Sequence, residues 1–234
     1  MVKEELVQRS PVRIFMNSIH GGLKSGELGV IASPSGIGKT SVLVQIALDK
    51  LLQGKKVIHI SFTQHTDHVL AWYEDIFGEF IRKKNLEDER DVKNEIVQNR
   101  VLMKFTQGGI TYEQILRSLR ALIKDGGFNA DALIIDGLDF SKLGEGYIAA
   151  LKSFASEMGV SAWLSCNVKG EEPYYDQRNI PLVIKGNADH FEVIIILVPK
   201  PDHIALTVSR DRDEYNPENL ALKLDPKTLL ILEN

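Results

Sequence analysis

The sequence contains one cysteine, Cys166, among its 234 residues. A single thiol excludes an internal disulfide, which fits a reducing cytosol. Residues 1–5 are charged and lack the apolar region of a signal peptide. The longest apolar run, residues 193–199, is too short to cross a bilayer. We therefore expect a cytoplasmic protein without a membrane partner.

An excess of positive charge is also missing, because 28 Lys and Arg residues face 32 Asp and Glu, giving a formal net charge of −4. This net charge does not favour the binding of nucleic acid by the protein as a whole, so only a local basic patch could bind it. The composition, 44% apolar and 26% charged, is that of an ordinary globular protein. With no internal repeat or obvious linker, the length suits one large α/β domain spanning 1–234.

Residues 33–40 read Ser-Pro-Ser-Gly-Ile-Gly-Lys-Thr, close to the phosphate-loop pattern Gly-x-x-x-x-Gly-Lys-Ser/Thr. An apolar run at 30–32 precedes them, and apolar residues at helical spacing follow from 41 to 52. This strand, loop and helix order is the context that the motif requires. Ser33 replaces the first glycine, but serine is small and Gly36 can supply flexibility. The alternative is a glycine-rich turn that only starts a helix.

In the favoured interpretation, backbone N–H groups of residues 36–40 wrap a β-phosphate at the positive end of the helix. Lys39 would reach the β- and γ-phosphates, and the Thr40 hydroxyl would hold Mg²⁺. The candidate nucleotide-binding residues of this segment are Ser35, Gly36, Ile37, Gly38, Lys39, Thr40 and Ser41.

Strand-like and helical segments alternate along most of the chain. Further strands are expected at 56–62, 101–105, 131–136 and 160–165, with helices at about 66–80, 111–125 and 146–158. The last quarter is rich in short strands, at 193–198, 204–209, 220–224 and 229–232. This order predicts a mainly parallel twisted sheet flanked by helices, finished by antiparallel C-terminal strands at one edge.

Asp136 ends the apolar strand 131–136. It could be an ordinary turn residue, but beside a phosphate loop a carboxylate at this place is the expected Mg²⁺ ligand. Two strand-like segments lie between Lys39 and Asp136. This spacing predicts at least one strand inserted beside the phosphate-loop strand, as in ATPases that act on macromolecules, and disfavours a small-molecule kinase.

The lead-in Gly-Gly-Leu-Lys-Ser-Gly-Glu-Leu at 21–28, and the order that follows through Ile-Ser-Phe-Thr at 60–63, resemble the RecA/KaiC/DnaB-type ATPases. The closest likeness is to stand-alone KaiC-like or RadA-like domains, and it extends more weakly from about residue 10 to the end. The resemblance implies a RecA-like P-loop NTPase fold that binds ATP and Mg²⁺. It also implies a homo-oligomer, a ring or a dimer, with the nucleotide near the subunit interface.

Three further positions take roles from this resemblance. Arg210 and Arg212 would reach the nucleotide of a neighbouring subunit and neutralise charge on the γ-phosphoryl group. Alternatively, they belong to a charged hairpin tip and pair with their own acids. Asn167 would sense the γ-phosphate, although Asn also begins loops for reasons of turn geometry alone.

The family usually has a glutamate that polarises the attacking water, and the alignment puts Thr63 there. Gln64 could orient a water, and the imidazole of His65 could act as a general base. We therefore expect slow or partner-dependent ATP hydrolysis in a nucleotide-dependent switch for an unidentified protein partner.

Two alternatives are a catalytically degenerate scaffold and a single-stranded-DNA-binding recombination or repair ATPase. DNA-binding proteins of this kind use basic loops with stacking aromatics. The loop 167–184 has Tyr174 and Tyr175, but its acids outnumber its basic residues. DNA is thus the less favoured partner.

Overall fold

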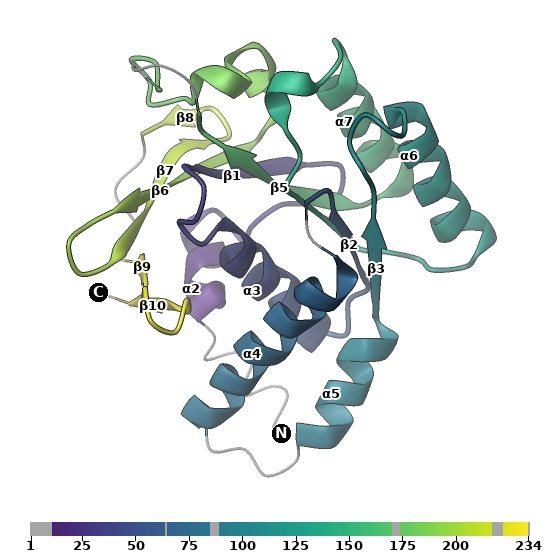
Figure 1. Ribbon diagram of the computed structural model, residues 1–234, viewed down its shortest axis with the longest axis vertical. Helices are drawn as coiled ribbons and strands as arrows, with labels where there is room; N and C mark the ends of the chain where they lie inside the picture. The colour runs from purple at the N-terminus through teal and green to yellow at the C-terminus, as the bar shows by residue number, and fades with distance from the viewer. Residues whose placement is uncertain (1–10, 64, 85–88, 170–173, 217–221, 234) are drawn as a thin grey trace.

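The computed structural model describes residues 11–63, 65–84, 89–169, 174–216 and 222–233. Within these ranges the strands are β1 (Leu28–Ser33), β2 (Val57–Ser61), β3 (Arg100–Lys104), β4 (Ala132–Asp136), β5 (Ser161–Asn167), β6 (Val193–Pro199), β7 (Ile204–Asp211), β8 (Glu214–Tyr215), β9 (Leu222–Leu224) and β10 (Ile231–Glu233). They form one mixed sheet in the order β10-β9-β7-β6-β1-β5-β4-β2-β3, with β8 paired to β7 (Figure 1).

The central part of the sheet is parallel. β1 pairs with β5 and β6, and β5, β4, β2 and β3 continue in the same direction. β1, β2 and β4 are buried along their whole length, as expected for parallel strands covered on both faces. The predicted inserted strand is present, because β5 lies between β1 and β4. β3 forms one edge of the sheet.

The other edge is antiparallel. β7 runs against β6, β9 against β7 and β10 against β9. The predicted architecture, a mainly parallel sheet flanked by helices with antiparallel C-terminal strands, is therefore confirmed at this level. One boundary was wrong: Leu229 was expected within the last strand, but it lies in the turn before β10 with a φ of 55°.

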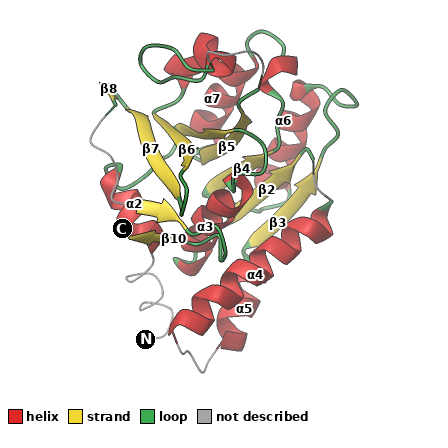
Figure 2. Ribbon diagram, turned by 60° about the vertical axis from the view of Figure 1, so that its left-hand side comes forward, coloured by secondary structure: helices red, strands yellow, loops and turns green. Residues whose placement is uncertain are grey.

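Helices cover both faces of the sheet (Figure 2). They are α2 (Pro11–Ser18), α3 (Lys39–Leu52), α4 (Thr66–Lys84), α5 (Glu89–Gln98), α6 (Tyr112–Arg120) and α7 (Tyr147–Met158). Apolar residues of α2 to α5 pack together on one face, and those of α6 and α7 form a second cluster on the other. Thr111, the first residue of the helix expected at 111–125, caps α6 in a capping box with Gln114.

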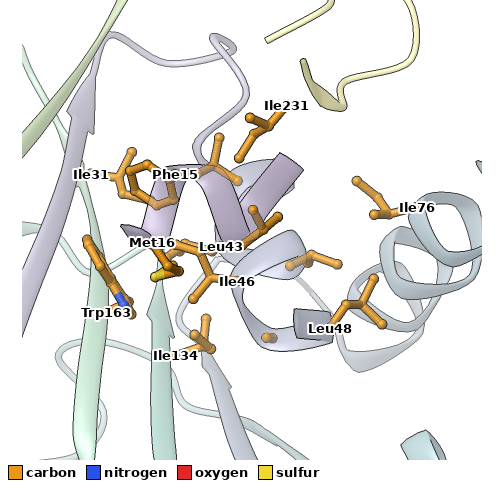
Figure 3. Packing of buried hydrophobic residues seen from close by; sticks show 14 of the residues in the cluster. Phe15, Met16, Ile31, Leu43, Ile46, Leu48, Ile76, Ile134, Trp163 and Ile231 are labelled. Atoms are coloured by element: carbon orange, nitrogen blue, oxygen red, sulfur yellow. The ribbon is translucent and has the colours of Figure 1, made fainter. Parts of the chain in front are cut away.

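α3 is the most deeply buried helix of the first layer. Its Leu43 and Ile46 lie between Ile134 and Trp163 of the sheet and side chains of the neighbouring elements, among them Ile76 of α4 (Figure 3). Because this helix is packed on all sides, its first turn and the loop before it are fixed relative to the strand ends. No helix in the described part of the chain is long and apolar enough to cross a membrane.

Candidate functional site

A pocket of about 400 Å³ lies where β1, β4 and β5 end. In open parallel sheets, ligands bind outside the carboxyl ends of the strands. The lining residues come from the segment that begins at Ser35, from the strand ends and from two more distant elements. They are Ser35, Gly36, Gly38, Lys39, Thr40, Ser41, Thr63, Trp72, Asp136, Gly137, Ser165, Asn167 and Leu229.

The loop between β1 and α3 leaves the start of the helix open. Gly38 precedes the helix with a φ of 101°, and a Cβ there would lie 2.6 Å from the Leu224 side chain. Only glycine suits both constraints. No side chain caps α3, so its first N–H groups and the positive end of its dipole are free for an anion.

Ser33, the departure from the loop pattern, has a structural explanation. It is the last residue of β1 and pairs with Asn167 of β5, so its backbone is extended and needs no glycine. The flexibility lies at Gly36, whose φ is 81°. The hydroxyl of Ser33 donates to the Pro34 carbonyl at 3.0 Å. Serine is therefore compatible with the loop.

Lys39 turns back over this loop. Its Nζ donates to the Ser33 carbonyl at 3.0 Å, to the Ser33 hydroxyl at 3.2 Å and to the Pro34 carbonyl at 2.7 Å. The side chain is buried, and burial lowers the pKa of Lys39 to about 8. Its hydrogen-bond acceptors are neutral, and the nearby Asp136 carboxylate offsets only part of the effect of burial on its pKa. A bound anion would therefore add opposite charge beside this ammonium.

Asp136 lies at the centre of a second group. The Thr40 hydroxyl donates to its Oδ2 at 2.8 Å, and the Ser165 hydroxyl donates to its Oδ1 at 2.6 Å. Ser165 also accepts the Gly137 N–H at 2.8 Å. Thr40 and Asp136, the two predicted metal ligands, are thus brought together. Sequence reasoning missed Ser165, although a serine near the end of an otherwise apolar strand is a usable signal.

The candidate catalytic positions are only partly assembled. Thr63 lines the pocket and packs against Gly137. Gln64 lies outside the described residues. His65 pairs with Asp67 at 3.1 Å and does not line the pocket. Among the described lining residues, Asp136 is the only carboxylate, and both of its oxygens already accept hydrogen bonds.

The remaining predicted binding residues fall into two groups. Ser35 and Asn167 line the pocket, Asn167 as the final residue of β5 where a loop start was expected. Ser41 lines it as well and donates its hydroxyl to the Leu229 carbonyl at 2.5 Å. Ile37 packs against the hydrophobic core, so it contributes to the loop through packing.

Arg210 and Arg212 lie at the other end of the sheet. Asp211, between them, is paired with Val193 at the start of β6, which runs parallel to β1. Arg210 donates to the Ala188 carbonyl at 2.6 Å, and Arg212 donates to the Gly22 carbonyl at 3.0 Å. Arg212 also pairs with Asp211 and Glu27. Within one chain these arginines stabilise local structure, and neither lines the pocket.

The tyrosines of the 167–184 loop are not free for stacking. Tyr174 and Tyr175 are half-buried and pack against the second core cluster. Lys169 donates to Asp139 at 2.8 Å, and Arg178 lies over the Tyr215 ring. Residues 170–173 are outside the described part. The described portion of this loop therefore offers no stacking platform of the kind that single-stranded DNA requires.

Trp72 and Leu229 also line the pocket without having been predicted as site residues. Trp72 belongs to the apolar periodicity of α4 and is indistinguishable there from a core residue. Leu229 is one of many leucines near the end of the sequence, and nothing local marks it.

The sequence matches no protein-family model, and no curated protein matches it.

Proposed function

We propose that this protein binds Mg-ATP in the pocket at the β1–α3 loop and acts as a nucleotide-dependent switch with slow or partner-dependent hydrolysis. The observation that carries the proposal is the convergence of Lys39, Thr40 and Asp136. The buried lysine and the hydroxyl from the first turn of α3 meet the carboxylate at the end of β4 beside an uncapped helix start. This is the donor set that a phosphate chain with its magnesium ion requires.

Each group has a role that follows from its chemistry. The first N–H groups of α3 would hold phosphate oxygens, and Lys39 would place its charge against them. Thr40 and Asp136 supply oxygen ligands of the kind that Mg²⁺ prefers, while phosphate and water complete its coordination. Bound Mg²⁺ would neutralise phosphate charge. Asn167, at the end of β5, could donate to the terminal phosphate.

Slow hydrolysis is proposed because the described lining residues include no free base. Thr63 stands where the resemblance puts a glutamate, and a threonine hydroxyl accepts no proton near neutral pH. Loss of general-base assistance costs roughly 10²–10⁴ in rate. A partner that contributes a side chain, or a neighbouring subunit, would restore turnover. If no turnover occurs at saturating ATP, the catalytically degenerate scaffold becomes the better description.

The test is calorimetric titration of the purified protein with Mg-ATP, beside the Lys39→Ala variant and a matched Lys185→Ala control. Lys185 has a side chain that is 62% exposed and does not line the pocket. We expect Lys39→Ala to weaken binding at least about tenfold and Lys185→Ala to leave it unchanged.

Binding that is indifferent to Lys39, or no binding by the wild type, would refute the proposed site. Turnover is then measured with the same variants, so that contaminating ATPase is recognised as activity that survives Lys39→Ala.

A further inference from the structure

The turn between β9 and β10 closes one side of the pocket. Leu229 lies in this turn and its side chain is half-buried at the pocket wall. Its carbonyl accepts hydrogen bonds from Ser41 Oγ at 2.5 Å and from Gln45 Nε2 at 2.9 Å. Gln45 is fully buried, and its Oε1 also accepts the Ile231 N–H at 2.8 Å. Two side chains of α3 therefore fix the turn against the start of the helix.

The first residues of α3 indicate which way a bound nucleotide would lie in the pocket. Thr40 faces β4, where Asp136 marks the side of the metal and the terminal phosphates. Ser41, the next residue, faces away from β4 and toward Leu229. In a phosphate loop the lysine and the metal hydroxyl serve the β- and γ-phosphates, so the α-phosphate and the nucleoside must extend toward Ser41. Leu229 stands on that side.

Trp72 lies at the opposite wall. It belongs to α4, which follows β2 and packs against α3 and against the edge strand β3. Figure 3 shows the two flanking elements near α3, with Ile231 of β10 and Ile76 of α4 on different sides of Leu43. Trp72 and Leu229 are the two large apolar side chains among the described lining residues. Of these, only Leu229 is on the nucleoside side.

We propose that the turn at residues 225–230 is the nucleoside-binding wall of the pocket, with the Leu229 side chain packed against the ribose and the base. This inference rests on the proposed function, because it takes the phosphate direction from it. A planar base needs an apolar surface on which to lie. Leu229 supplies that surface and is held in a left-handed conformation, φ 55°, that leucine rarely adopts.

The polar groups of the same turn determine how strongly the wall can discriminate between bases. Several of its polar groups are engaged within the turn: Asp225 accepts from the Lys227 and Leu229 N–H groups and from the Thr228 hydroxyl. The Leu229 carbonyl is used twice by α3. Strong discrimination between bases requires a site built to hydrogen-bond one of them. A wall that offers chiefly apolar contact therefore accepts adenine and guanine with similar affinity.

The test compares ligands with and without a nucleoside. ATP, GTP and inorganic tripolyphosphate, each with Mg²⁺, are titrated into the wild type and into Leu229→Ala, Leu229→Met and Leu182→Ala. Leu182 is 44% exposed and lies outside the pocket, so it is the matched control. Thermal unfolding of each variant verifies that it is folded.

We expect Leu229→Ala to weaken ATP and GTP binding about tenfold each, and to leave tripolyphosphate within about twofold. Leu229→Met restores an apolar contact of similar size and should recover most of the ATP and GTP affinity that Leu229→Ala loses. ATP and GTP should differ by less than about tenfold in the wild type.

Three results would overturn the inference. They are an unchanged ATP affinity in Leu229→Ala, an equal loss for ATP and tripolyphosphate, and a preference for one base above about a hundredfold. The proposed function fails separately, when no ligand binds in a manner that depends on Lys39. If ATP binding depends on Lys39 but is unchanged in Leu229→Ala, the nucleoside-binding wall is refuted and the proposed function stands.

Discussion

Replacing Lys39 with methionine should stabilise the ligand-free protein while it abolishes nucleotide binding. Burial lowers the pKa of Lys39 from 10.5 to about 8. At about 1.4 kcal/mol per pH unit, this corresponds to roughly 3 kcal/mol by which the folded state disfavours the charged lysine at neutral pH. Methionine has a similar length and carries no charge to desolvate.

Little is lost in exchange, because the carbonyls that Lys39 contacts keep other donors. The Ser33 carbonyl also accepts the Val168 N–H at 3.0 Å, and the Pro34 carbonyl accepts the Ser33 hydroxyl. We therefore expect Lys39→Met to be more stable than the wild type by up to about 3 kcal/mol near pH 7.

The gain should depend on pH with a definite sign. Between about pH 8 and 10.5 the unfolded wild type binds a proton at this lysine that the folded state has released, so wild-type stability rises with pH across this window. Lys39→Met lacks this contribution, and the difference between the two proteins should shrink as the pH rises through it. Urea unfolding followed by circular dichroism at about pH 7 and about pH 10 measures both quantities.

Lys185→Met is the control, since its exposed ammonium should contribute nothing measurable. A Lys39→Met variant that is less stable than the wild type near neutral pH would refute the reasoning, as would a stability difference that is the same at both pH values.

Three further predictions concern other pocket residues. Ser165→Ala removes the donor to Asp136 and the acceptor of the Gly137 N–H, so it should cost about 1–3 kcal/mol in urea unfolding; no loss would show that this network is dispensable. Trp72 lines the pocket whereas Trp163 is buried in the core. Mg-ATP should therefore change the tryptophan fluorescence of Trp163→Phe, which keeps Trp72, but not that of Trp72→Phe. The reverse pattern would exclude Trp72 from the site. Thr63→Glu should raise ATP turnover by about 10²-fold, and an unchanged rate would contradict the alignment at that position.

The parts of the site that the sequence predicts are those encoded within a few consecutive residues. The strand, loop and helix around Lys39 form one contiguous segment, so their order is visible before any folding argument is made. Asp136 could be proposed because an apolar strand ends on it. Both were found without knowledge of tertiary contacts, and the structure brings Thr40 and Asp136 to within hydrogen-bonding distance.

The missed residues reach the pocket through the register of neighbouring strands and through contacts between segments far apart in the sequence. Ser165 reaches Asp136 because Leu164 of β5 pairs with Ile135 of β4, and no local pattern encodes that register. Leu229 reaches Ser41 across most of the sequence. The partners of Arg212, Gly22 and Glu27, are equally distant along the chain, so local charge patterning could not reveal them.

The position of β5 has a consequence for biosynthesis. A nascent chain that has reached Asp136 already carries the lysine, the hydroxyl and the carboxylate of the pocket. However, β1 and β4 do not touch in the finished sheet, and the strand that joins them is translated later. Until β5 emerges and pairs with both, each presents an open strand edge, which is the kind of surface that aggregates or recruits chaperones. Ribosome pausing after residue 136 would therefore leave both of these edges open, whereas pausing after β5 would leave open the edge of β1 that later pairs with β6.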